Sequence, residues 1–323
     1  MALLREDNHK LNLRTAITAM GLSLAFAPSI STANDRSIIV PMFELYHTDN
    51  LNGGTTSAQF DNNGTLVSTP LNMKPKSGTV YKAGVIWANA YSRSLGTTKL
   101  SISPFLFVKD DSENYAPSKN IGGSVKLTLL DTAERSVIAS LTAGRVMPKL
   151  TADKSNYLSV GLKFKQAIDP TQNITFSVAS SSVNKIADNT SDPTNNSISA
   201  SYSKNLDSFK INAGLEFTDR KSKTASFSGT DQNVFLEIKY PMGRHDVYAR
   251  YSHTESSDDA IRTTQAALRE QTSRLYELGY SMPIPVTDLA KLTFYANRLD
   301  ASSNLDLYQS ETNTFGIKAS INF

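Results

Sequence analysis

The chain has 323 residues, with 33 Lys and Arg against 30 Asp and Glu, a formal net charge of +3, and no cysteine. The lack of cysteine excludes disulfide scaffolds, thiol catalysis and thiolate metal sites. The small charge surplus, without a dense basic tract, argues against a nucleic-acid partner. Mean hydropathy is −0.30, and past the amino end no apolar run is long enough for a membrane helix. A barrel strand meets lipid only at every second residue, so this hydropathy also fits a membrane barrel.

Residues 1–33 have the pattern of a secretory signal. Lys10 and Arg14 precede the apolar stretch 16–30, and small residues at 31–33 suit a cleavage site. We therefore expect export, with residues 1–33 as a signal peptide and residues 34–323 as a single mature domain.

The rest of the chain alternates apolar and polar residues, most cleanly in the segment 209–218. One side of that segment carries Phe209, Ile211, Ala213, Leu215 and Phe217, and the other carries Lys210, Asn212, Gly214 and Glu216. Side chains along a strand alternate between two faces, so the pattern predicts strands with one apolar and one polar face. We expect strands at 38–47, 79–93, 99–109, 121–131, 136–144, 157–166, 173–183, 196–204, 209–218, 233–240, 246–254, 274–282, 289–299 and 313–323.

The gaps between these segments alternate between long polar stretches and short turns. Outer-membrane barrels have this asymmetry, with long extracellular loops and short periplasmic turns. The fold class predicted is all-β: a transmembrane antiparallel up-and-down barrel of about 14 strands, in the range 12–16. The longest gap, 48–77, contains an apolar run at 65–71 and is our candidate for a segment that plugs the barrel.

The final segment, 313–323, places alternating apolar residues on one face and ends in Phe323. It resembles the C-terminal strand of Gram-negative outer-membrane β-barrel proteins of the porin-like class. The resemblance implies that Phe323 is the signal read by the barrel assembly machinery. A weaker resemblance, to the C-terminal barrel of the surface lipoprotein assembly modifier family, rests on Arg298, Ser303, Asn304, Tyr308, Thr314, Gly316 and Phe323. The helical repeat region of that family has no counterpart in this sequence.

Many charged residues fall opposite the apolar side chains, and Asp246 shares their phase. A charge facing lipid costs roughly 2–4 kcal/mol near the bilayer midplane, so we expect the polar face to line the lumen. An excess of bases there predicts a preference for anions, unless acids and bases pair across strands and fill the interior. The expected lumen residues are Lys82, Lys99, Lys126, Lys163, Lys165, Lys210, Lys239, Arg250, Lys291, Lys318, Glu216, Glu237 and Glu277.

Aromatic residues near strand ends fit the girdles that mark the two membrane interfaces. The alternative is that some of them are ordinary strand formers. The expected girdle comprises Tyr46, Tyr81, Tyr91, Tyr202, Tyr240, Tyr251, Tyr280, Phe217 and Phe323.

Catalytic chemistry finds little support. His245–Asp246 and Asp258–Asp259 are similar to the pairs of omptin-type proteases, but the predicted topology places them at opposite ends of the barrel. The run Ser302-Ser303-Asn304 lacks the histidine of outer-membrane phospholipases. We therefore expect no enzyme, no cofactor and no metal site, and read the polar loop with Asp188, Asn189, Asp192 and Asn195 as solvated.

The sequence thus predicts a passive or gated channel for small polar solutes, preferentially anions. An alternative from another class is a barrel that translocates or displays a protein or lipoprotein with the help of a partner. An outer-membrane hydrolase is a third and weaker alternative. The expected partners are the lipid bilayer and lipopolysaccharide, the barrel assembly machinery, small solutes and, under the second hypothesis, a protein client.

Overall fold

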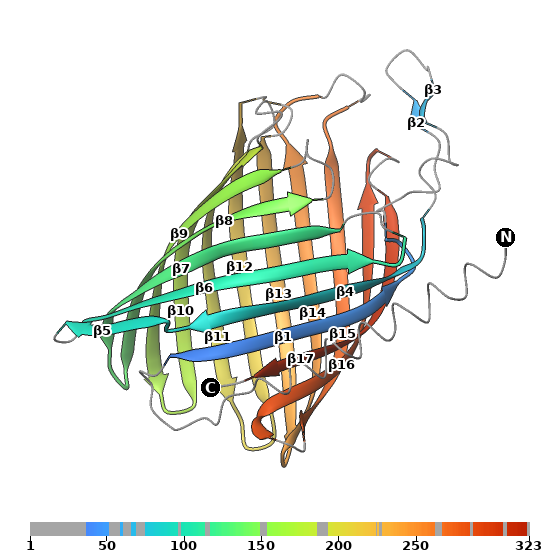
Figure 1. The fold of residues 1–323 in the computed structure, drawn as a ribbon. Coiled ribbons are helices and arrows are strands. Elements are labelled where there is room, and N and C mark those ends of the chain that lie inside the picture. Colours follow the sequence, from blue (N-terminus) through green and yellow to red (C-terminus); the bar gives the residue numbers. More distant parts are fainter. Residues whose placement is uncertain are drawn as a thin grey trace.

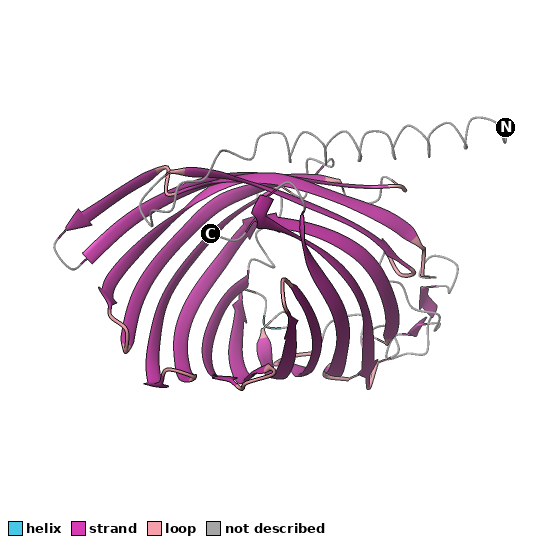
Figure 2. Ribbon diagram, turned by 90° about the horizontal axis from the view of Figure 1, so that it is seen from below, coloured by secondary structure: helices cyan, strands magenta, loops and turns pink. Residues whose placement is uncertain are grey.

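The computed structural model describes residues 37–51, 59–60, 66–68, 75–95, 98–113, 117–148, 154–185, 193–223, 225, 228–261, 267–284, 287–305 and 309–321. The expected signal peptide and Phe323 lie outside these ranges. Within them, antiparallel strands form one sheet that closes on itself as a barrel (Figure 1; Figure 2). Closure gives nearly every described wall strand a hydrogen-bonded neighbour on both sides.

The barrel wall has 14 strand positions, as the sequence predicts. Consecutive strands pair with each other, and β1 pairs with both β4 and β17, which closes the ring. The wall consists of β1 (Ile38–Thr48), β4 (Gly78–Ala88) with β5 (Tyr91–Leu95), β6 (Thr98–Asp111), β7 (Ser118–Asp131), β8 (Arg135–Pro148), β9 (Ser155–Asp169), β10 (Gln172–Lys185), β11 (Pro193–Asn205), β12 (Lys210–Ser222), β13 (Gly229–Met242), β14 (His245–Asp258), β15 (Glu270–Ile284), β16 (Thr287–Ser303) and β17 (Ser310–Ile321).

β4 and β5 occupy one position in the wall, because both pair with β6. They are separated at Asn89, whose φ is +50°. Asparagine tolerates this left-handed conformation better than most residues, since its short polar side chain can hydrogen-bond locally. The sequence pattern predicted a single strand over 79–93, and the break at Asn89 lies within that strand.

Connections of two lengths alternate along the chain. Short ones such as 132–134, 170–171 and 243–244 lie at one end of the barrel, which we call the short-turn end. The opposite end, with connections such as 112–117 and 259–269, is the long-loop end. Gly243, at φ +65°, makes the tight turn between β13 and β14.

Several strands extend further toward the long-loop end than the sequence pattern predicted. β13 begins at Gly229, β14 continues to Asp258, and β15 begins at Glu270. Backbone pairing needs no apolar side chains, so the ladder continues into residues that lack the apolar alternation. This is why a pattern based on hydrophobicity ends these strands too early.

The segment predicted as a plug contains a small separate hairpin. β2 (Gln59–Phe60) pairs with β3 (Leu66–Ser68) in a sheet of its own. In both views this hairpin stands outside the ring of wall strands. The apolar run 65–71 thus contributes to a hairpin beside the barrel, and the rest of the predicted plug, apart from 48–51 and 75–77, lies outside the described residues.

One face of the barrel wall is apolar and open to its surroundings. Leu278 and Ile198 are each 63% exposed, and Leu215 is 56% exposed. A soluble monomer rarely exposes so extensive an apolar surface, whereas a bilayer solvates it. Among the described residues, no helix is long and apolar enough to cross a membrane.

The opposite face is the inner one, as contacts that skip a strand demonstrate. Tyr295 on β16 reaches Glu44 on β1 across β17, and Lys291 on β16 reaches Asp246 on β14 across β15. Side chains converge on the concave side of a curved sheet and diverge on the convex side. Such contacts therefore identify the face of Glu44 and Asp246 as the interior of the barrel.

Candidate functional site on the inner wall

All thirteen residues that the sequence placed in the lumen share the face of Glu44. The register aligns Glu44 with both Lys82 and Lys318, and it continues from strand to strand around the barrel without moving any of the thirteen to the other face. The cross-strand pairs Lys210–Lys239, Glu237–Arg250 and Arg250–Glu277 are examples of this alignment. The register therefore places all thirteen on the face of Glu44.

One part of the inner face carries lysines without acidic partners. We call Lys126 on β7, together with Lys163 and Lys165 on β9, the basic wall. Lys126, Lys163 and Lys165 are exposed, and no ion pair joins any of these three to a described carboxylate. Their inner-face neighbours on β8 and β10 are uncharged, among them Ser140 and Ser177. This wall therefore presents uncompensated positive charge to the interior.

Elsewhere on the inner face, acids and bases pair, as the alternative interpretation of the lumen charges predicted. Lys82 Nζ lies 2.8 Å from Glu44 Oε2. Asp246 Oδ2 accepts from two lysines, at 3.1 Å from Lys239 and 2.7 Å from Lys291. These contacts join strands of the wall. The Lys82–Glu44 pair is neutral, whereas the group at Asp246 keeps a positive charge because two lysines share one carboxylate.

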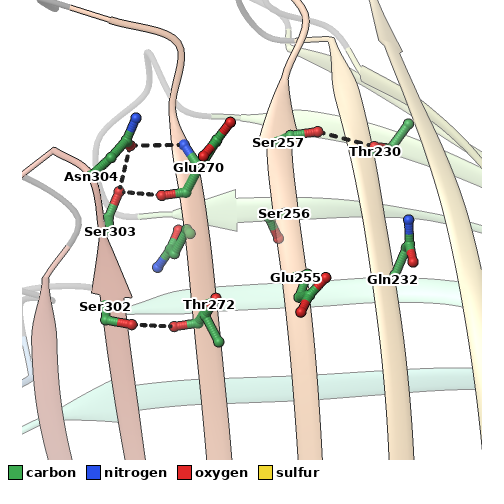
Figure 3. Close-up of a pocket in the computed structure, with 11 residues that line it drawn as sticks. Thr230, Gln232, Glu255, Ser256, Ser257, Glu270, Thr272, Ser302, Ser303 and Asn304 are labelled. Carbon is green, nitrogen blue, oxygen red and sulfur yellow. Dashed lines mark hydrogen bonds between the residues drawn. The ribbon is translucent and has the colours of Figure 1, made fainter.

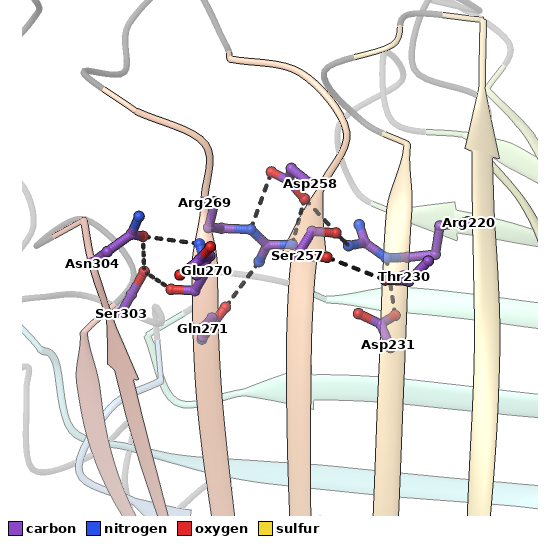
Figure 4. A network of polar contacts seen from close by, with 10 residues as sticks. All are labelled: Arg220, Thr230, Asp231, Ser257, Asp258, Arg269, Glu270, Gln271, Ser303 and Asn304. Atoms are coloured by element: carbon purple, nitrogen blue, oxygen red, sulfur yellow. Dashed lines mark hydrogen bonds and ion pairs between the residues drawn. The ribbon is translucent and has the colours of Figure 1, made fainter.

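A denser network lies at the long-loop end of β12–β15 (Figure 4). The side chain of Asp258 is fully buried; its Oδ1 is 3.2 Å from Arg220 and 2.8 Å from Arg269. Arg220 also lies 2.9 Å from Asp231, and Arg269 donates to Gln271 at 2.8 Å. A buried carboxylate between two guanidinium groups is satisfied by charge and geometry together. The network joins the ends of four strands where the 259–269 connection begins and ends.

A row of tyrosines alternating with glycines crosses the inner face from β1 to β14. The register aligns Tyr46 with Gly316, Gly316 with Tyr295, Tyr295 with Gly279, and Gly279 with Tyr248. A Cβ at Gly316 would lie 2.5 Å from Tyr295 Cζ, and one at Gly279 would lie 2.2 Å from Tyr248 Cε1. The rings of Tyr295 and Tyr248 therefore occupy the space above the neighbouring glycine that a side chain there would fill.

Hydrogen bonds fix these rings in place. Tyr295 Oη donates to Glu44 Oε1 at 2.8 Å, and Tyr248 Oη donates to Glu277 Oε1 at 2.9 Å. Lys82 Nζ lies 4.8 Å from the centre of the Tyr46 ring, within cation–π range. The tyrosines are thus held by the charged residues that flank them.

Together these residues line a cavity of about 470 Å³ on the inner wall, within the range typical of small-molecule sites. We call it the tyrosine cavity. Lys318 is exposed in it and forms no ion pair with a described carboxylate. The lining consists of Glu44, Tyr46, Lys82, Tyr248, Glu277, Thr293, Tyr295, Asn297, Thr314 and Lys318.

Sequence analysis found three of the charged members of this cavity and missed the tyrosines. Tyr46 was assigned to the aromatic girdle; this was wrong, because it shares the inward phase of Glu44. Strict counting by two from Glu44, Asp246 and Lys291 would have found Tyr46, Tyr248 and Tyr295. That signal was masked because the aromatic side chains had been counted with the apolar face.

A second polar cavity, of about 500 Å³, lies at the long-loop end of β13–β16 (Figure 3). Gln232, Glu255 and Thr272 have the phase of the outer face. Asn304 Oδ1 accepts from the backbone of Glu270 at 2.9 Å, which ties β16 to β15 here. This cavity lies on the outside of the barrel, away from the interior.

The residues weighed for catalysis do not form one site. His245 begins β14 and Asp258 ends it, so the 14-residue length of the strand separates them. His253 lies 3.2 Å from Glu255 on the outer face. Among the described residues, no group of three His, Asp or Glu side chains could hold a metal ion. Residues 186–192, with Asp188, lie outside the described part of the chain.

Comparisons with known proteins agree with this geometry. The chain is similar in fold to a solved structure titled TodX monoaromatic hydrocarbon channel deltaS2 mutant, with 9% identity, a TM-score of 0.51, and coverage of 92% of this chain and 93% of that one. A Pseudomonas aeruginosa FadL homologue (10% identity, TM-score 0.48, 88% and 90% covered) and an anion-selective porin from Comamonas acidovorans (9%, 0.44, 89% and 100%) are more distant in fold. At such identities the likeness concerns the fold alone.

No protein of curated function matches the sequence. The model of the family described as Gram-negative porin matches residues 110–320, which is more than half of the chain. With the closed antiparallel barrel, its apolar outer face and its charged inner face, this match makes the chain a member of the Gram-negative porin family and a channel-type barrel of the outer membrane.

Proposed function

We propose that this barrel is a channel for small polar solutes with a preference for anions, and that the thirteen inner-face residues named above line its pore. The observation that carries the proposal is the basic wall. Lys126, Lys163 and Lys165 are exposed and unpaired with any described acid, and charged linings set the ion selectivity of a pore. Because several other inner-face charges pair with one another, these lysines contribute a large part of the net positive charge of the inner face.

The test is the reversal potential of the protein in a planar bilayer with a KCl gradient. Wild-type protein should favour chloride. Replacing Lys163 and Lys165 together by Gln should move the reversal potential toward that of potassium-selective conduction, because two uncompensated charges leave the lumen.

The matched control is the double substitution of Lys119 and Lys204 by Gln. Both residues have the phase of the outer face, so the same loss of charge should leave the reversal potential unchanged. Equal shifts in the two double variants would overturn the assignment of the basic wall to the pore.

One observation favours the alternative, a barrel that moves or displays a protein with a partner. β1 pairs with β17 only from Phe43 to Thr48, although the same strand pairs with β4 along its whole length from Ile38. Pro41 lies in the part of β1 that is not paired with β17, and it lacks a backbone N–H to donate to a ladder. This seam is the shortest pairing between adjacent described wall strands, apart from the β4–β5 position.

A disulfide between β1 and β17 would distinguish the channel hypothesis from the translocator hypothesis. The natural chain has no cysteine, so Leu45→Cys with Ile317→Cys, an aligned pair, gives a single cross-link. A channel should conduct equally in the oxidised and reduced states. A barrel that opens at the seam to pass a polypeptide should lose transport on oxidation and recover it on reduction.

The cellular setting that we propose follows from the same class of protein. Residues 1–33 would direct export, and Phe323 would be read by the barrel assembly machinery. The long-loop end would face outward, toward lipopolysaccharide, where the polar outer-face residues Gln232, Glu255 and Thr272 lie beyond the apolar band. Removing Phe323 should reduce the amount of assembled barrel without changing the conductance of the molecules that do assemble.

A further inference from the structure

We propose that the tyrosine cavity is a binding site for a sugar acid, a pyranose ring that carries a carboxylate. The inference rests on the proposed channel function and names the class of anion that the pore selects. It starts from a contrast between two sets of inner-face lysines. The basic wall offers charge alone, whereas Lys318 offers charge beside a row of flat aromatic rings.

The rings form a preorganised stacking surface. Tyr295 and Tyr248 lie over Gly316 and Gly279, so each ring packs against the backbone of the neighbouring strand and lines the cavity from there. Their hydroxyl groups are held by Glu44 and Glu277. Aromatic faces bind the apolar C–H faces of a sugar ring, and a surface already fixed loses little side-chain entropy on binding.

The polar groups of the cavity discriminate between a sugar acid and an aromatic acid. The hydroxyl of Thr293 already pairs with that of Ser281 at 2.8 Å, but Thr314 and Asn297 also line the cavity and offer a hydroxyl and an amide group. The ring hydroxyls of a sugar can pair with them, whereas a benzoate ring would leave them unsatisfied at a cost in free energy. The class that fits both the rings and these polar groups is the sugar acid.

Lys318 binds the carboxylate of the sugar acid. Lys82, the other base in the cavity, is already paired with Glu44 at 2.8 Å. Lys318 is exposed in the cavity and forms no ion pair with a described carboxylate, although the charge of nearby Glu44 acts on it. An ammonium group near a stacking surface forms a charge-assisted hydrogen bond with a carboxylate, which is stronger than a neutral one. A neutral sugar lacks this contact.

The experiment is isothermal titration calorimetry of the full-length protein, folded in detergent, with sodium glucuronate, glucose and sodium benzoate. Glucuronate should give a saturable heat, with glucose and benzoate binding about tenfold more weakly or not at all. Lys318→Gln should weaken glucuronate binding about tenfold, whereas Lys119→Gln on the outer face should leave it unchanged.

Substitutions of one tyrosine test the stacking surface. Tyr295→Phe keeps the ring and loses the hydrogen bond to Glu44, so glucuronate binding should fall by about twofold. Tyr295→Leu removes the ring and should weaken binding by about tenfold. Retention of heat-modifiable migration on gels verifies that each variant still forms a barrel.

The inference is overturned if glucuronate does not bind the wild-type protein, if Lys318→Gln and Lys119→Gln bind it equally, or if benzoate binds as tightly as glucuronate. The last result would make the cavity a site for aromatic acids. Calorimetry needs no conductance, so these outcomes are independent of the reversal-potential test. If the barrel binds glucuronate but shows no anion selectivity, the proposed anion preference of the channel is wrong and the proposed binding site is still supported.

Discussion

The ring of Tyr248 occupies the space above Gly279 on the next strand, where an added Cβ would lie 2.2 Å from Tyr248 Cε1. Tyr295 has the same relationship to Gly316, at 2.5 Å from its Cζ. Glycine in a strand is intrinsically unfavourable. At these two positions, the ring of the neighbouring strand covers the exposed backbone and compensates for the missing side chain.

We predict that Gly279→Ala destabilises the barrel by about 1–3 kcal/mol, because the methyl group must displace a hydrogen-bonded tyrosine. Urea unfolding of the protein folded in lipid vesicles measures the change. Gly123→Ala is the matched control, since a Cβ there meets nothing closer than 3.8 Å. Equal unfolding midpoints for the two variants would contradict the role of the ring.

The buried carboxylate of Asp258 should be critical for stability at the long-loop end. Asp258→Asn removes the charge between Arg220 and Arg269, whose side chains are only 17% and 13% exposed, and should cost about 3 kcal/mol. Asp219→Asn breaks an ion pair with Lys221, which is 70% exposed, and should cost less than about 1 kcal/mol. The same unfolding assay compares them; similar losses would show that the network adds nothing beyond a surface pair.

Insertion of charge into the outer face should be tolerated far less than insertion into the inner face. Leu278 is 63% exposed near the middle of β15. Leu278→Lys should therefore reduce the free energy of unfolding of the barrel in bilayers by about 2–4 kcal/mol. Asn212→Lys adds the same charge on the inner face beside Glu237 and should change it by less than about 1 kcal/mol. If Leu278→Lys folded as stably as wild type, the assignment of the apolar face to lipid would fail.

Trp87 is the single tryptophan and so reports on one point of the outer surface. It has the phase of the outer face, is 49% exposed, and its indole N–H donates to Ser37 near the short-turn end. Its fluorescence should be quenched by lipids brominated near the headgroup more than by lipids brominated at the chain end. Efficient quenching by aqueous iodide, with no effect of brominated lipid, would place this end of β4 outside the bilayer.

The sequence alone determined the fold class and the faces. A period of two fixes which side chains share a face, and lipid excludes unpaired charge from one of them. Every residue predicted for the lumen, from Lys82 to Lys318, therefore has the inward phase in the structure. The strand ends were less predictable, because beyond the apolar band the ladder of β13–β15 is held by backbone hydrogen bonds between polar residues such as Thr230 and Ser257.

Only the tertiary structure decided which of these residues meet. The phase of a strand gives no register between strands, so nothing in the sequence aligned Tyr46 with Tyr295 and Tyr248 through two glycines. Nor did it distinguish Lys82, which forms an ion pair with Glu44, from Lys318, which forms no ion pair with a described carboxylate. The face on which a side chain lies follows from the alternation along its own strand, so the local sequence determines it. Contacts between strands depend on closure of the barrel, which brings together residues as distant in sequence as Glu44 and Tyr295.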